Sequence, residues 1–238
     1  MRSAGDRPLP PFRWDWLQQM LELVFPTRCA GCGSLGSVWC ERCDASLEPL
    51  RGPLCAWCGD PHSGPAPCRR CQAMSLSLPV RSFAYYRGPL ARALVQLKYR
   101  PRRGLAEVMG AWLRQVVLRA AWEPHIIVPV PLGRGRRRKR GYNQVALIAS
   151  SLAGNLGIQS RPTAIQRIRE TPSQVGLDAA ARRENVQGAF LARPQDVQNE
   201  SVCLVDDLMT TGATLVACAE ALRLAGCADV VGVTVGRA

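Results

Sequence analysis

The sequence predicts an α/β protein in which a mainly parallel sheet has helices on both of its faces, preceded by a smaller cysteine-rich module. From residue 82 onward, short apolar runs alternate with segments of helical periodicity, which is typical of parallel strands buried beneath helices. Eight of the eleven cysteines, by contrast, fall between residues 29 and 71. Hydrophobic residues make up 47% of the 238 residues and charged residues 21%, which excludes a disordered, a collagen-like or a simple coiled-coil chain.

The cysteines of the module form four C-x-x-C pairs, and these are Cys29/Cys32, Cys40/Cys43, Cys55/Cys58 and Cys68/Cys71. Two intervening residues let both thiolates of a pair face one metal ion, and two pairs complete a tetrahedral shell. The pattern therefore predicts two structural Zn²⁺ ions. The repeat of C-A-x-C-G at residues 29 and 55 favours sequential pairing, although crossed pairing stays open.

Other interpretations of the cysteines fit the pattern less well. A disulfide framework needs an oxidising compartment, and no signal in the sequence directs the chain to one. A redox motif would explain one pair but not four. We expect His62 to be a bystander, because eight thiolates already fill two sites. We expect the remaining cysteines to fill the core, and these are Cys203, Cys218 and Cys227.

The chain is expected to divide into three parts: an N-terminal helical segment (1–28), a double zinc-binding module (29–80) and an α/β domain (81–238). Residues 14–25 have apolar positions three to four apart, which predicts a short amphipathic helix that packs on a neighbour. We find neither a secretory signal nor an apolar stretch that would span a membrane, and we therefore expect a soluble, cytoplasmic protein.

The elements of the domain follow from periodicity and from the residues that end each segment. Pro131 ends the second apolar run, and Gly157 and Gly226 follow two of the helical segments. The predicted strands are 82–86, 126–130, 202–205 and 230–235. The predicted helices are 90–98, 104–121, 144–156, 179–185 and 214–224.

The turn after the apolar run 202–205 carries the strongest functional pattern. Asp206 and Asp207 are expected at the carboxyl end of a strand, where open α/β sheets bind ligands. The next segment enters a helix, so its backbone amides and the helix dipole favour an anion. The candidate phosphate-binding residues are Thr210, Thr211, Gly212, Ala213 and Thr214.

Two carboxylates beside a phosphate cradle make sense if they accept hydrogen bonds from ribose hydroxyls or hold Mg²⁺. The pattern therefore indicates a sugar 5′-phosphate. Neither the P-loop motif nor the glycine fingerprint of dinucleotide-binding domains is present. An acidic strand end followed by an ordinary threonine cap would explain one Asp and one Thr, but not the ordered set.

The charge of the chain is concentrated in one stretch. The net charge is +13, and residues 81–140 contain 15 basic and 2 acidic residues, so this stretch accounts for the whole excess. Such a concentration indicates an anionic partner. Its densest part has basic residues at six of the seven positions 134–140, and these are Arg134, Arg136, Arg137, Arg138, Lys139 and Arg140.

The run VDDLMTTGAT at 205–214 resembles the phosphoribosyl-pyrophosphate (PRPP) signature of type I phosphoribosyltransferases. Further segments resemble the ComF family, which includes competence protein ComF and GntX-like relatives. These segments are the eight-cysteine module, LKY at 97–99, VPVPL at 128–132, RRKRGYNQ at 137–144, R-x-R-x-T-x-x-Q at 167–174 and R-x-x-N-V-x-G-A-F at 182–190.

The resemblance implies the type I phosphoribosyltransferase fold and a set of roles. Asp206 and Asp207 would bind the ribose hydroxyls of PRPP, and residues 210–214 would bind its 5′-phosphate, with Mg²⁺ as cofactor. The basic loop 134–140 would correspond to the pyrophosphate loop, and residues 169–185 would form a lid. The implied activity is phosphoribosyl transfer to or from a nucleobase-like acceptor, within nucleotide metabolism and associated with competence and DNA uptake. No catalytic base is identified.

Two further interpretations remain open. The protein could be a non-catalytic PRPP sensor that binds single-stranded DNA through the basic loop 134–140, helped by arginines at 100, 102 and 103 and by stacking on Tyr99 and Tyr142. Against this, the loop could simply be a solvated charged face. Alternatively, the N-terminal module and its helix could dock on a protein partner.

Overall fold

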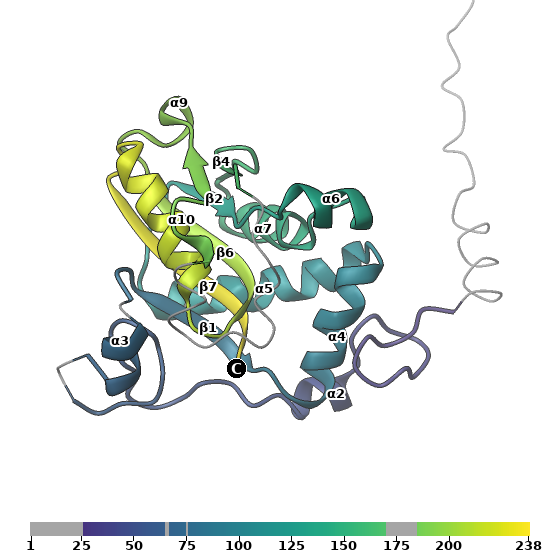
Figure 1. Cartoon of the computed structure of the whole chain (residues 1–238). Coiled ribbons are helices and arrows are strands. Elements are labelled where there is room, and N and C mark those ends of the chain that lie inside the picture. The colour runs from purple at the N-terminus through teal and green to yellow at the C-terminus, as the bar shows by residue number, and fades with distance from the viewer. Residues whose placement is uncertain (1–25, 65–66, 75, 170–184) are drawn as a thin grey trace, which may run out of the picture.

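The computed structural model describes residues 26–64, 67–74, 76–169 and 185–238. A five-stranded sheet forms its centre, and every neighbouring pair of strands is parallel (Figure 1). The strand order across the sheet is β1 (Val80–Tyr85), β7 (Asp229–Arg237), β6 (Ser201–Met209), β2 (Ile126–Pro129) and β3 (Gln159–Ser160). The parallel sheet predicted from the alternating pattern is confirmed.

Helices cover both faces of the sheet, because successive residues of a strand point to opposite sides and the central strands are apolar on both sides. Ile127 and Cys203 face a core formed with α4 (Gly88–Tyr99), α5 (Arg103–Arg119) and α7 (Gln144–Leu156). Ile126 and Val202 face the other core, formed with α10 (Ala213–Leu224). A small antiparallel sheet packs on α10, and it consists of β4 (Ile165–Arg167) and β5 (Phe190–Ala192). The short helix α9 (Pro194–Val197) follows β5.

Two predicted elements need correction. The strand predicted at 202–205 continues to Met209, because β7 is equally long and pairs with β6 up to Met209 and Arg237. Asp206 and Asp207 therefore lie within the strand, near its carboxyl end. The basic segment is not a loop but helix α6 (Arg134–Arg140), which an extended Gly133 precedes and a left-handed Gly141 (φ 78°) follows. Arginine and lysine favour helices, and the two glycines set its ends.

The predicted helix 144–156 coincides with α7, and the predicted helix 104–121 overlaps α5. The predicted helices at 14–25 and 179–185 lie outside the described residues, apart from Asn185, and so does the predicted lid apart from its two end residues. Cys203 and Cys218 are fully buried, as expected of core residues, and Cys227 is partly buried. In the described ranges, no helix combines the length and the apolar character that crossing a membrane requires.

The cysteine-rich module contains two short helices, α2 (Glu41–Ala45) and α3 (Arg69–Met74), and packs against the sheet domain at two places. Ala30 joins the core beside α4 and α5, and the Trp39 ring lies edge-on to Trp112 with centroids 5.2 Å apart. Cys55 and Cys58 join the opposite core, beside α10. The module thus contributes to both cores, and the division into parts at residues 28/29 and 80/81 stays a prediction.

Candidate functional site

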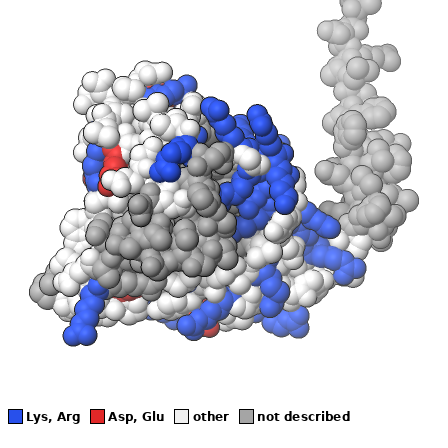
Figure 2. Space-filling view, in the orientation of Figure 1, with Lys and Arg blue, Asp and Glu red and all other residues white. Residues whose placement is uncertain are grey.

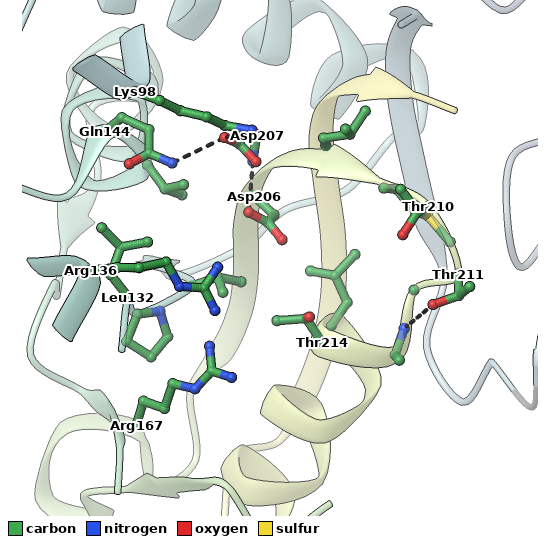
Figure 3. A pocket seen from close by; sticks show the side chains of 18 of the residues that line it. Lys98, Leu132, Arg136, Gln144, Arg167, Asp206, Asp207, Thr210, Thr211 and Thr214 are labelled. Atoms are coloured by element: carbon green, nitrogen blue, oxygen red, sulfur yellow. Dashed lines mark hydrogen bonds and ion pairs between the residues drawn. The ribbon is translucent and has the colours of Figure 1, made fainter. Parts of the chain in front are cut away.

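A pocket of about 400 Å³ opens at the carboxyl ends of β2 and β6 (Figure 3). It is lined by the end of β6, the turn into α10, the segment after β2, two residues each of α6 and α7, and one residue each of α4 and β4. All seven residues predicted to bind a phosphorylated sugar line it: Asp206, Asp207, Thr210, Thr211, Gly212, Ala213 and Thr214. The structure therefore brings the complete predicted set together around one cavity.

The basic side chains of helix α6 lie on two sides of the helix, one facing the pocket and one facing solvent. Arg136 and Arg140 line the pocket, and they are four residues apart, which places them on one face of the helix. The other four basic residues do not line it and are exposed, and these are Arg134, Arg137, Arg138 and Lys139. The pocket thus uses only part of the charge that was predicted to surround it.

The turn at the end of β6 brings backbone amides close to the pocket. Gly212 adopts a left-handed conformation (φ 75°) directly before the first residue of α10. A Cβ at this position would lie 2.9 Å from Cε of Met209 and 3.0 Å from Cδ1 of Leu76, so no side chain fits without a shift. Thr211 Oγ1 accepts a hydrogen bond from the Ala213 amide (3.4 Å). Because first-turn amides of a helix lack intrahelical acceptors, this geometry suits an anion.

Asp206 and Asp207 point to opposite sides of β6 and have different surroundings. Asp207 is buried, and its Oδ2 accepts a hydrogen bond from Gln144 Nε2 (3.0 Å) and lies 3.5 Å from Lys98 Nζ. The Asp206 Oδ1 accepts a hydrogen bond from the Asp207 amide (2.8 Å). Burial, and then the negative charge of Asp207, raise the pKa of Asp206 to about 8. Protonation of one carboxyl and pairing of the other reduce the repulsion that a phosphate would meet.

The segment from Arg140 to Gln144 connects four parts of the pocket wall. Arg140 donates to Oε1 of Gln144 (3.0 Å), whose amide nitrogen holds Asp207. The Tyr142 hydroxyl donates to the carbonyl of Leu97, next to Lys98. Asn143 caps α7 by accepting from the Val145 amide (3.1 Å), and it donates to the carbonyl of Val130 (3.0 Å). Each side chain of this motif therefore fixes a neighbour of the pocket.

Three polar residues of the pocket were not assigned a role from the sequence: Lys98, Gln144 and Arg167. All three lie in segments that resemble the ComF family, but their contact with the pocket depends on folding. Arg167 comes from β4, with its guanidinium over the Phe190 ring (5.5 Å), and it points into the cavity beside Arg136 and opposite Thr214 (Figure 3).

The eight cysteines form two groups of four, and within each group the Sγ atoms lie within 4.8 Å of one another. The groups are Cys29, Cys32, Cys40, Cys43 and Cys55, Cys58, Cys68, Cys71, so sequential pairing is confirmed. Neighbouring Sγ atoms are 3.5–3.6 Å apart. A tetrahedron with Zn–S bonds of about 2.3 Å has edges of about 3.8 Å, so both groups fit structural zinc. Gly33 (φ 81°) and Gly59 (φ 69°) adopt the left-handed conformation that such turns use.

Comparison with known proteins identifies the family. Residues 20–72 match the double zinc ribbon domain. The chain is 36% identical over 199 residues to DNA utilization protein YhgH of Salmonella typhimurium, covering 80% of this chain and 86% of that protein. It is 29% identical over 219 residues to competence protein F of Haemophilus influenzae, covering 87% of this chain and 95% of that protein. Competence protein ComFC of Bacillus subtilis is 29% identical over 187 residues, with 74% of each chain covered.

Solved structures show weaker similarity. Glutamine PRPP amidotransferase from B. subtilis, complexed with ADP and GMP, aligns with a TM-score of 0.41 and 19% identity. The alignment covers 59% of this chain but only 30% of that one. A phosphoribosyltransferase from Corynebacterium diphtheriae aligns with a TM-score of 0.37 and 22% identity, covering 61% of this chain and 72% of that one. Because both TM-scores are below 0.5, the family of this chain is assigned from the relatives above. The chain belongs to the ComF family and contains a double zinc ribbon domain ahead of its parallel-sheet domain.

Proposed function

We propose that the pocket binds PRPP together with Mg²⁺ and that the protein transfers phosphoribose to, or removes it from, a nucleobase-like acceptor. One observation carries this proposal. A helix-start turn suited to a phosphate, two carboxylates and the side chains of Lys98, Arg136, Arg140 and Arg167 line the same cavity. This arrangement matches a sugar that carries a phosphate at one end and a pyrophosphate at the other.

The roles follow from position. The turn 210–214 takes the 5′-phosphate, because its amides and hydroxyls are neutral donors at a helix start. Asp206 and Asp207 accept hydrogen bonds from the ribose hydroxyls. Arg136 and Arg140 neutralise the pyrophosphate as it departs, which stabilises an oxocarbenium-like transition state. Mg²⁺, when bound, adds its own charge to the same leaving group.

The names of the relatives suggest the process in which this chemistry takes place. Because relatives are named for DNA utilization and competence, we infer that this protein acts in DNA uptake or processing. The acceptor would then be a nucleobase-like compound of nucleotide metabolism, and the protein would work in the cytoplasm. Acceptor, process and location all stay predictions.

Calorimetry with PRPP and Mg²⁺ tests the binding site. At pH 9, where Asp206 with its pKa of about 8 is ionised, Asp206→Asn and Asp207→Asn should each weaken binding roughly tenfold or more, because hydrogen bonds to charged groups contribute about 1.5–3 kcal/mol. Asp229→Asn is the matched control, since this exposed carboxylate lies at the other end of the sheet. If the three variants and the wild type bind alike, the site is assigned wrongly. Pyrophosphate release in the presence of a panel of bases then tests turnover.

A second function is favoured by the outer face of α6. Its four exposed cations gather with further Lys and Arg side chains where α6 lies beside α4, on the face that Figure 2 shows. One pyrophosphate does not need this many charges, whereas a single-stranded DNA backbone would use them. In this alternative the protein is a non-catalytic PRPP sensor that binds single-stranded DNA. Tyr99, which is 73% exposed at the end of α4, is available for base stacking, whereas Tyr142 is held by its bond to Leu97.

The two faces of α6 allow the two functions to be separated. Neutralising the outward residues Arg134, Arg137, Arg138 and Lys139 to Gln should weaken single-strand binding in an anisotropy assay. It should also reduce the slope of log K against log salt concentration by about 0.7 for each phosphate contact that is lost. The variant Arg136→Gln/Arg140→Gln should instead weaken PRPP binding. Single-strand binding that survives in the outward variant would remove the second function.

A further inference from the structure

The second zinc ribbon, defined by the four ligands Cys55, Cys58, Cys68 and Cys71, lies against the turn that we propose to bind the phosphate. Leu76 follows this ribbon, and its amide donates to the carbonyl of Cys71 (3.4 Å). Its Cδ1 atom lies 3.0 Å from the place that a Cβ on Gly212 would take. Leu76, Met209 and Ala213 share one apolar core with three of the four cysteines. The ribbon therefore forms part of the packing beneath the turn.

A buried arginine connects the same ribbon to the end of β6. The side chain of Arg237, the last residue of β7, has no exposed area. Its Nη2 lies 2.7 Å from Oδ2 of Asp60, and its Nη1 donates to Sδ of Met209 (2.8 Å). A buried charge is strongly destabilising without its partner, so the position of Arg237 depends on Asp60. Met209 is the residue from which the turn begins.

The position of Asp60 depends in turn on the knuckle that holds the metal. The Asp60 carbonyl accepts a hydrogen bond from the Cys55 amide (2.8 Å), and the Gly59 amide donates to the carbonyl of Cys55 (3.0 Å). Metal ligation closes such a knuckle and contributes directly to its folding. Loss of the metal would therefore release Asp60, then Arg237, and then the end of β6.

We propose that the second ribbon is a support for the phosphate-binding turn, with Arg237 as the positioning residue that connects them. Metal retention in this ribbon sets the order of the turn and hence the affinity of the pocket for a phosphorylated sugar. The affinity part of this inference rests on the proposed PRPP binding, whereas the part about the order of the turn does not.

The first ribbon provides an internal comparison. Its polar contacts with the domain, among the described residues, involve α4 and the residue before α5. Gln96 Nε2 donates to the carbonyl of Ala30 (3.0 Å), and Arg102 Nη2 donates to the carbonyl of Arg28 (3.1 Å). Those contacts leave the turn 210–212 untouched. Metal loss from the first ribbon should therefore leave the turn ordered.

Matched double variants test the inference in the full chain. Cys58→Ser/Cys68→Ser removes two neighbouring ligands of the second ribbon, and Cys32→Ser/Cys40→Ser removes the corresponding pair of the first. Zinc content verifies that each variant has lost one metal site. Hydrogen–deuterium exchange of peptides spanning 208–215 should rise about tenfold in the second-ribbon variant, within the usual range of coupling effects. Calorimetry with PRPP and Mg²⁺ should show a loss of similar size.

The first-ribbon variant should stay within about twofold of the wild type in both measurements, well below typical coupling effects. Equal effects of the two variants on the turn, or no effect of the second-ribbon variant, would overturn the proposal. Wild-type protein that does not bind PRPP contradicts the proposed function alone, because the exchange measurement still tests the support of the turn.

Asp60→Asn separates the arginine link from metal loss. This variant should keep both metals, by zinc analysis, and should still raise exchange at 208–215. Asp60→Glu keeps the negative charge and should restore most of the protection. If exchange in Asp60→Asn equals that of the wild type, Arg237 does not position the turn.

Discussion

Gln144 and Asp207, 63 positions apart in the chain, are joined by a hydrogen bond of 3.0 Å that is buried from solvent. Gln144 is the first residue of α7, and Asp207 lies near the carboxyl end of β6. On its other side, Gln144 accepts a hydrogen bond from Arg140 at the end of α6. One amide thus connects the basic helix to a carboxylate of the candidate sugar site, and it fixes both of them relative to the pocket.

Gln144→Ala should destabilise the protein by about 1–3 kcal/mol, because the buried Asp207 carboxylate loses its amide donor and keeps the contact with Lys98. Urea unfolding followed by circular dichroism measures this change. The control is Gln115→Ala, an exposed glutamine on α5, which should change the free energy of unfolding by less than about 0.5 kcal/mol. Equal stabilities of the two variants would show that the bond to Asp207 contributes nothing.

The raised pKa of Asp206 should make the ligand-free protein less stable as the pH rises. The folded pKa is about 8, whereas an unfolded aspartate has a pKa of about 3.9. Folding therefore favours the protonated carboxyl. Below about pH 4 both states are protonated and the free energy of unfolding is unaffected, whereas it falls as the pH rises from about 4 to about 8. Asp206→Asn removes this loss of stability and should be more stable than the wild type by roughly 2–5 kcal/mol at pH 8, with little difference at pH 4.

Thermal unfolding of both proteins across pH 4–9 measures this effect. Asp196→Asn serves as a control for the loss of a carboxylate outside the pocket, since Asp196 pairs with Arg193. A stability difference between Asp206→Asn and the wild type that does not grow with pH would contradict the raised pKa.

Gly212→Ala should lower the free energy of unfolding by more than the strain of a left-handed alanine, because the new Cβ also meets the Met209 and Leu76 side chains. A left-handed residue with a Cβ costs roughly 1–2 kcal/mol, and overpacking against the ends of the Met209 and Leu76 side chains adds about 1 kcal/mol, the low end of its usual range. Gly188 is the matched control, because it is also left-handed (φ 63°) but a Cβ there would meet no atom within 4 Å. Gly188→Ala should therefore cost only the conformational part. Chemical denaturation of both variants separates the two contributions, and equal costs would refute close packing of Met209 and Leu76 at the turn.

The wild-type protein should contain two zinc ions per chain, and His62→Ala should leave that number unchanged, because each shell is filled by four thiolates. Elemental analysis measures the content. Chelation should lower the thermal midpoint strongly, since structural zinc contributes folding free energy directly. A loss of one zinc in His62→Ala would show that the histidine replaces a cysteine as ligand.

Much of the fold was readable from local patterns. The period of α7, the apolar run of β2 and the spacing of the cysteines depend on residues that are close in sequence. Each pattern therefore predicted its own element or metal group. The end of β6 was predicted too early, because Asp206 and Asp207 are polar and the strand reaches Met209 only through pairing with β7. The segment 134–140 is predicted as a loop, because its run of positive charges has no apolar periodicity that would indicate a helix. The structure shows helix α6 there, between Gly133 and Gly141.

The sequence by itself determined the chemical components: eight thiolates spaced for two metal shells, a strand-to-helix turn suited to a phosphate, and a concentrated positive charge. Only the tertiary structure decided that Lys98, Gln144 and Arg167 join the turn in one pocket, and that Arg237 ties the second ribbon to its base. The physical reason is that spacing along a chain constrains only nearby residues. Contacts across 63 or 177 positions form when helices and ribbons pack on the two faces of a shared sheet.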